Sequence, residues 1–344
     1  MTTATGTPPH ASSSGRPGMR FAVDAWDPGY GVSVDLDGEL GGSTAEVDPN
    51  VEVPLERWRP LPPVADLTPP PAVLFVDGVR RIDARVWIEP RSGPGPSAGA
   101  VTLGICASYA AGVVVCNGHL ATLGAAEVRR GLFTTTVDGD AVTTRAGDYP
   151  LRPSRSDEAG DLSLALQRSL AETEVDSAVA ARAALPDVPP ASDDDLLVID
   201  GPLRGRTHLP RTIGYIKTHR ASYLPPELNA VVGALAAGQR TPLFHMGTSW
   251  DRYSWYLRLP CRPNGAWAGI VRVECSPDLA LPDAVRLANL SQTVLPRYAS
   301  AEHKDHRAPQ NLYPIAGLER QLRRRLGDPA LLYRAVRRAA TGAP

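Results

Sequence analysis

The sequence predicts an α/β domain in which a mixed β-sheet is flanked by helices. Several strand-like segments come first, and a long amphipathic segment, residues 161–185, follows them. After this helix the chain alternates short apolar strands with helical segments. A mixed sheet covered by helices accounts for that order.

The N-terminal part divides into two expected segments. Residues 1–18 lack an apolar stretch behind a basic patch, so they predict a disordered leader rather than a secretory signal. Residues 19–70 alternate apolar and polar positions around glycine and proline turns, which favours a strand-rich lead-in. We expect the folded domain to cover 19–340, with its core at 71–340.

The first strong strand signal is the apolar run at 73–76, which ends in Asp77 and Gly78. Three further strand candidates follow it, DARVWIEP, VTLGICASYAAGVVVC and AEVRRGLFTTTV. These segments would form the first, sequentially adjacent strands of the sheet.

The second half of the chain carries the alternating elements. We expect strands at 196–200 and 214–219, a helix at 226–237, and a hairpin from SWYLRLPC and GAWAGIVRVEC. Helices are expected at 283–296 and 316–339.

Composition excludes several classes of protein. Hydrophobic residues make up 43% of the 344 residues, yet no apolar run approaches the roughly 20 residues of a membrane span. The four cysteines have no CxxC spacing, and Cys106 and Cys116 lie in an apolar strand, so we expect core residues rather than a disulfide framework. We therefore expect a cytoplasmic protein without a membrane partner.

Two aspartates stand at similar places in the pattern. Asp77 and Asp200 each follow a wholly apolar strand and precede glycine. Ligands of α/β sheets bind beyond the carboxyl ends of strands, so neighbouring strands would bring these carboxylates together. Taken singly, each Asp-Gly pair is also a common turn signature.

A third acid continues the buried stripe of the long helix. Leu162, Leu166 and Leu170 recur every four residues, and Glu174 is the next position on that face. Three converging carboxylates repel one another unless a divalent cation lies between them. Oxygen ligands without a His/Cys cluster favour Mg²⁺ or Mn²⁺, and a pair of such ions would suit phosphodiester hydrolysis.

At this point the chain resembles a known family. The segments FVDGVRRIDA, VIDGPL, GYIKTH, AGQRTPLF and RAPQNLYPIAGLERQLRRRLGD, with the Glu174 helix, are similar to the NurA nuclease domain over roughly residues 20–340. The resemblance implies an RNase H-like fold and Mn²⁺-dependent cleavage of DNA as a 5′–3′ exonuclease and single-strand endonuclease. It also implies a homodimer docked on a HerA-like hexameric ATPase.

Carried over by position, the resemblance implies metal-binding roles for Asp77, Glu174 and Asp200. Tyr313 matches the family's Tyr-Pro segment as a catalytic residue, and Asp305 matches an acid before it that would also bind metal. The family's histidine about two turns later is missing here, where Arg320 and Gln321 stand. His303 or His306 would then help hold a second ion, or that ion binds more weakly.

Other basic and aromatic residues are candidates for DNA contact. Lys217 would hold the scissile phosphate as a catalytic residue, or it lies exposed at a strand end. His219 would orient water or contact nucleic acid, with the same alternative. Arg240 would contact a phosphate or satisfy carbonyls at a helix end.

The net charge of −1 does not indicate a nucleic-acid protein, but the C-terminal segment is rich in arginine. Arg323, Arg324 and Arg325 would line a DNA path or form a solvated helix face. The tryptophans would stack on bases or pack in the core; these are Trp26, Trp58, Trp255 and Trp267.

Two other functions remain open from the sequence. One is a catalytically weak ring subunit that guides DNA for the motor. The other is an RNase H-like phosphotransferase acting on RNA/DNA hybrid or on transposon ends.

Overall fold

A computed structural model describes residues 19–23, 45–89, 101–136, 139–185, 195–217, 223–262, 265–301, 303–305 and 307–342. The expected leader at 1–18 and residues 24–44 of the expected lead-in lie outside these ranges. The described part of the lead-in holds strands β1 (Arg20–Val23) and β2 (Glu46–Asp48) and a short 3-10 helix at Leu55–Arg57.

Five strands form the centre of the fold. They are β3 (Ala72–Glu89), β4 (Thr102–Asn117), β5 (Leu120–Thr134), β9 (Asp195–Asp200) and β10 (Thr212–Ile216). Their order in the sheet is β5-β4-β3-β9-β10. β4 runs antiparallel to both its neighbours, whereas β9 is parallel to β3 and β10 is parallel to β9. Three antiparallel strands, a helix and two strands parallel to the first are the RNase H-like arrangement, so the expected fold class is confirmed.

Shorter strands extend this centre. The hairpin of β12 (Asp251–Arg258) and β13 (Ile270–Cys275) was expected, and it joins β10 to β11 (Phe244–Gly247) and β2. β8 (Leu151–Pro153) pairs with β5, and β1 pairs with the far end of β3. A separate two-stranded sheet is formed by β6 (Val142–Thr144) and β7 (Gly147–Tyr149).

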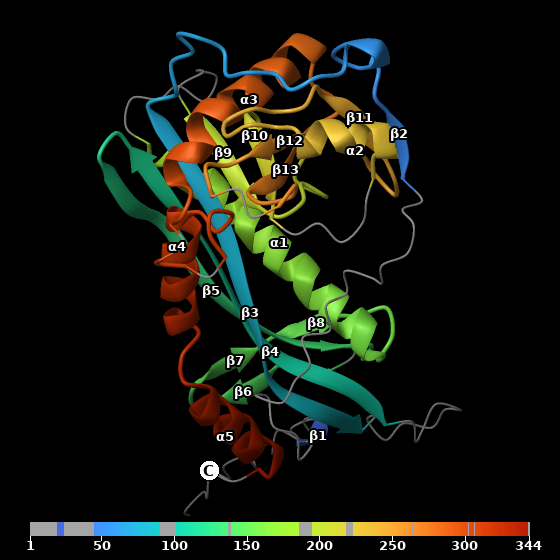
Figure 1. Cartoon of the computed structure of the whole chain (residues 1–344). Helices are drawn as coiled ribbons and strands as arrows, with labels where there is room; N and C mark the ends of the chain where they lie inside the picture. The colour runs from blue at the N-terminus through green and yellow to red at the C-terminus, as the bar shows by residue number, and fades with distance from the viewer. Residues whose placement is uncertain are drawn as a thin grey trace, which may run out of the picture.

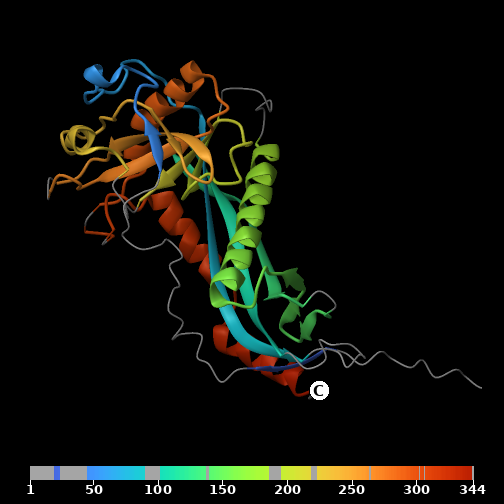
Figure 2. The same ribbon diagram turned by 90° about the vertical axis from the view of Figure 1, so that its right-hand side faces the viewer.

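Helices cover both faces of the long strands. α1 (Ala159–Ala183) lies on one face and α4 (Tyr313–Arg325) on the other, as Figures 1 and 2 show. Alternation along β3 decides which side chains meet which helix. Leu74 and Val76 belong to the core beneath α1, whereas Val73 and Phe75 belong to the core shared with α3 (Leu281–Val294) and α4.

The C-terminal helical segment is broken, so the single helix expected at 316–339 is wrong. α4 ends at Arg325 and α5 begins at Pro329 and runs to Ala340. Gly327 between them adopts a φ of 85°, which favours glycine. The carboxylate of Asp328 then accepts a hydrogen bond from the Leu331 amide at 2.8 Å and caps the new helix. α5 lies against β1 and β6, away from α3 (Figure 1).

β3 is longer than the sequence suggests. The expected end at Asp77 is wrong, because Asp77 pairs with Gly112 of β4 and the pairing continues to Ile88. A register shift between Ile82 and Ala84 bends the strand without ending it. The Asp-Gly pair at 77–78 is therefore not a turn.

The structure also confirms the helix expected after the second half's strands and the two core cysteines. The helix predicted at 226–237 is α2 (Pro226–Gly233), which is shorter at its C-terminal end. Cys106 and Cys116 are buried and free, as expected for core residues. Among the described helices, none combines the length and the apolar character that a membrane crossing requires.

Candidate metal centre

Asp77 and Asp200 lie side by side where β9 separates from β3. The parallel pairing of the two strands ends with Val76 opposite Ile199, and each aspartate is the next residue along its strand. β9 stops at Asp200, whereas β3 continues. The two carboxylates therefore stand at a fork in the sheet, the place where ligands of α/β sheets bind.

Glu174 approaches this fork from α1. A Cβ atom placed on Gly78 would lie 2.5 Å from Glu174 Oε1 and 2.7 Å from Leu170 Cδ1. Gly78 thus leaves open the space that the Glu174 carboxylate fills above the strand. The side chain of Glu174 is buried at 5% exposure, as the helical periodicity predicts.

The groups around Asp77 shift its pKa in opposite directions. Burial raises its pKa well above the usual range, and the charges of Asp200 and Glu174 raise it further. The Lys217 ammonium and a 2.8 Å hydrogen bond from the Gly78 amide to Asp77 Oδ1 act in the opposite direction. Asp77 lies beside Asp200 at the end of the pairing, and its neighbour Gly78 faces Glu174 Oε1, so the three acids lie near one another.

An arginine that the sequence analysis did not single out holds Glu174. Arg206, in the loop after β9, forms an ion pair with Glu174 Oε2, and both side chains are largely buried. Burial raises the pKa of Glu174, whereas the Arg206 guanidinium lowers it. Arg206 is thus the partner of Glu174 Oε2 in this structure.

A chain of polar contacts leads from Asp200 to the C-terminal segment. Lys217 Nζ donates to Asp200 Oδ2 at 2.6 Å and lies 3.5 Å from Asn311 Oδ1. Asn311 in turn donates from Nδ2 to Asp305 Oδ2. Burial raises the pKa of Asp200, and Lys217 opposes that rise. Asp305 therefore reaches the site through Asn311 and Lys217 rather than directly.

The donor set suits a hard divalent cation. In the structure Glu174 pairs with Arg206 and Asp200 pairs with Lys217. No three His, Cys, Asp or Glu side chains of the described chain already form a metal-binding group. Three neighbouring carboxylates, two of them buried and that of Asp200 largely shielded, nevertheless offer the oxygen ligands that Mg²⁺ and Mn²⁺ prefer. These residues could bind such an ion once the side chains of Arg206 and Lys217 release the carboxylates.

The expected C-terminal site residues lie around the fork without joining it. Tyr313 begins α4, is 42% exposed, and accepts a hydrogen bond from the Ala301 amide at 3.0 Å. Arg323 is exposed and pairs with Glu319 at 2.8 Å, and Arg324 is exposed on the same helix. Glu319 is close enough to Asp200 to raise its pKa, a proximity that the sequence analysis missed.

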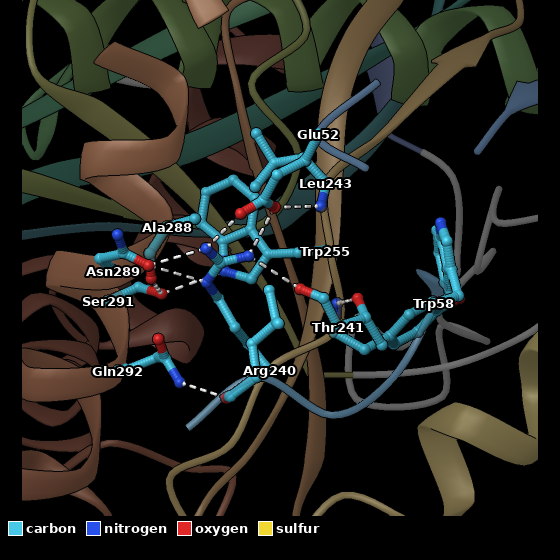
Figure 3. A network of polar contacts seen from close by, with 12 residues as sticks. Glu52, Trp58, Arg240, Thr241, Leu243, Trp255, Ala288, Asn289, Ser291 and Gln292 are labelled. Atoms are coloured by element: carbon cyan, nitrogen blue, oxygen red, sulfur yellow. Dashed lines mark hydrogen bonds and ion pairs between the residues drawn. The ribbon is translucent and has the colours of Figure 1, made fainter. Parts of the chain in front are cut away.

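The structure contradicts the expected role of Arg240 in DNA contact. Arg240 is 2% exposed, and its guanidinium forms two 2.8 Å hydrogen bonds to the Glu52 carboxylate (Figure 3). Its remaining N–H groups donate to Asn289 Oδ1 and to the Thr241 carbonyl. Because every donor is engaged inside the protein, Arg240 ties the lead-in to the core and has none left for a phosphate.

The other candidates divide by exposure. His219, His306 and Trp26 lie outside the described residues, whereas His303 is exposed. Trp58 and Trp255 are buried, which fits the core alternative, and Trp267 is 39% exposed.

Two cavities lie in other parts of the described structure. One of about 750 Å³ lies between α5 and the β6–β7 hairpin, and one of about 310 Å³ lies beside Pro70 and Tyr298. Neither is lined by the converging acids. We locate the site by its carboxylates, because a phosphodiester and its metal need charge rather than an enclosed apolar pocket.

Comparison with known proteins supplies the family. Two solved structures are similar to the chain at low identity: the NurA nuclease from Sulfolobus solfataricus (TM-score 0.42, 11% identity, 79% of this chain and 85% of that one) and the catalytic domain of human Endonuclease V (TM-score 0.34, 17% identity, 80% and 85%). At such TM-scores these similarities carry no weight for function. No curated protein matches the sequence.

The family's sequence profile is the decisive match. The NurA domain profile matches residues 72–323, which is most of the chain and includes Asp77, Glu174 and Asp200. The matched range begins with the first strand of the central sheet and ends in α4. The chain therefore belongs to the NurA domain family and carries that family's nuclease domain.

Proposed function

We propose that this domain hydrolyses phosphodiester bonds in DNA with Mn²⁺ or Mg²⁺ bound by Asp77, Glu174 and Asp200. The observation that supports the proposal is that the carboxylates of Asp77, Glu174 and Asp200 come together at one fork of the sheet. Bound there, the cations would activate a water and stabilise the departing oxygen.

The chain's own residues prepare this site. The Gly78 amide fixes Asp77 Oδ1, and Lys217 orients Asp200 through a 2.6 Å hydrogen bond. Tyr215 donates from its hydroxyl to the Gln310 carbonyl at 2.6 Å, which anchors the segment bearing Asn311. These contacts hold the ligands in place before substrate arrives, which lowers the cost of reaching a reactive geometry.

The finer assignments come from the family. We infer a 5′–3′ exonuclease and single-strand endonuclease that works as a homodimer with a HerA-like hexameric ATPase, in DNA end processing or defence. Tyr313 and Asp305 would act at the edge of the site, and Lys217 would turn to the scissile phosphate when a cation takes over Asp200. The exposed arginines of α4, Arg323 and Arg324, would contact the DNA backbone.

The test is cleavage of linear single- and double-stranded DNA by purified protein with Mn²⁺, with and without the ATPase. Asp77→Asn and Asp200→Asn should each abolish cutting while the circular dichroism spectrum stays unchanged. The matched control is Asp176→Asn, an exposed acid on the same helix as Glu174 that pairs with Arg129. Its cutting should match that of wild type.

Other outcomes would redirect the assignment. Cutting that survives Asp77→Asn would remove the proposed site. If the wild-type protein binds DNA but does not cut it, whichever metal is supplied and whether or not the ATPase is present, the subunit that guides DNA would be favoured. Preference for RNA/DNA hybrid over DNA would favour the phosphotransferase alternative.

A further inference from the structure

The loop between β9 and β10 is anchored by its backbone. The Gly201 amide donates to the Tyr215 carbonyl at 2.9 Å, and the Leu203 amide donates to Glu274 Oε1 at 2.7 Å. Glu274 is fully buried, and Arg272 pairs with it at 2.8 Å. The backbone next to Asp200 is therefore fixed by contacts to β10 and β13.

The side chain of Arg206 leaves this anchored loop and reaches Glu174. Its Nη1 donates to the Pro202 carbonyl at 3.0 Å, and its Nη2 forms the ion pair with Glu174 Oε2. Arg206 Nε is buried and has no hydrogen-bond partner among the described residues, so the contact with Glu174 is made through Nη2. The contact supplies charge but lacks the bidentate geometry of a strong arginine–carboxylate pair.

We propose that Arg206 is an internal counter-ion that competes with the divalent cation for Glu174, and so weakens metal binding until it is displaced. This inference rests on the proposed function. A carboxylate at 5% exposure is costly to leave charged and alone, so without a metal it needs either a proton or a nearby cation, and Arg206 is that cation here. The same oxygen lone pairs serve either the guanidinium or the metal.

Arg206 is held by fewer contacts than Lys217, so a metal ion displaces it more easily. Lys217 makes a hydrogen bond of good length to Asp200 and lies near a second partner, Asn311. Among the described residues, Arg206 contacts only its own loop carbonyl, that of Pro202, besides Glu174. Because the loop backbone is fixed, release requires only side-chain rotation, which is fast compared with loop movement.

The experiment measures Mn²⁺ affinity by electron paramagnetic resonance of the free ion and by calorimetry, without DNA. Arg206→Gln should bind Mn²⁺ about tenfold more tightly than wild type, because a competing charged hydrogen-bonded partner is worth at least that factor. The matched control is Arg204→Gln, which removes an exposed arginine from the same loop and should leave the affinity within about twofold.

A double-mutant cycle separates contact from general charge. In a Glu174→Gln background, Arg206→Gln should no longer tighten Mn²⁺ binding. Metal-free Arg206→Gln should melt below wild type, and saturating Mn²⁺ should close that gap. If Arg206→Gln destabilises the protein too far, Arg206→Lys should give a smaller tightening in the same direction.

Results that contradict the counter-ion role differ from results that contradict the proposed function. Equal or weaker Mn²⁺ binding by Arg206→Gln would overturn the counter-ion role and make Arg206 a support for Glu174. Absence of saturable Mn²⁺ binding in wild type, or binding that persists in Asp77→Asn, would overturn the proposed function itself.

Discussion

The Glu52–Arg240 pair and the Glu174–Arg206 pair join the same two residue types inside the protein, but they differ in how many of their hydrogen-bonding groups have partners. Arg240 uses all its donors, and Glu52 also accepts from the Leu243 amide at 2.7 Å. In the second pair Arg206 Nε has no hydrogen-bond partner among the described residues, and two further acids lie near.

The difference separates structure from function. A buried ion pair with every donor satisfied holds distant segments together, here the lead-in and the region around α3. An incomplete pair among like charges is costly, and such costs are typical of places where a ligand completes the arrangement. Completeness of hydrogen bonding therefore distinguishes two arginines that the sequence presents alike.

The largest effect should follow from breaking the complete pair. Arg240→Met should lower the free energy of unfolding by about 3–5 kcal/mol, because it leaves the Glu52 carboxylate buried without its partner. Chemical denaturation measures this loss. Adding Glu52→Gln should restore part of it, and a loss under 1 kcal/mol would show that the network contributes little.

Filling the space beside the incomplete pair should be next in size. Gly78→Ala places a methyl group 2.5 Å from Glu174 Oε1, so it should displace that carboxylate and reduce cleavage about a hundredfold. Steady-state cleavage rates report the change. Gly317→Ala, with no atom within 4 Å of the added methyl group, should leave the rate unchanged and stabilise α4 by up to about 1 kcal/mol.

Removing one of the crowded charges should stabilise the metal-free protein. The folded-state pKa of Asp77 is raised, so its contribution to stability is present below the unfolded pKa of about 3.9 and is lost as pH rises through the folded pKa. Asp77→Asn should therefore match wild type near pH 4 and melt a few degrees higher at pH 8. Differential scanning calorimetry measures the difference, and added Mn²⁺ should reverse it by stabilising only wild type.

The smallest effect should come from the exposed helix arginines. Arg324 has no side-chain partner in the described chain, whereas Arg323 is held by Glu319. Arg324→Ala should lower the salt dependence of DNA binding by about one released counterion, and Arg323→Ala by less. Fluorescence anisotropy across a salt series measures both slopes, and equal slopes in wild type and Arg324→Ala would place the DNA elsewhere.

Part of this site could be predicted from local patterns. The leucine spacing of α1 points Glu174 inward, and the apolar run before Asp200 ends a strand as expected. The course of β3 through Asp77 could not be predicted, since pairing with β4 overrides the turn preference of Asp-Gly. Nor could the partners of Arg206 and Arg240, because a loop has no periodicity and Glu52 is 188 residues from Arg240.

The uninterrupted pairing of β3 with β4 has a mechanical consequence. Asp77 sits within the span of a stiff ladder, whereas Asp200 and Arg206 stand where the neighbouring strand has ended and a loop has begun. Any adjustment of the site to a passing nucleic-acid strand must therefore be made by the side chains of the loop, whose backbone is anchored, and by α1. The ladder serves as the fixed reference against which those parts move.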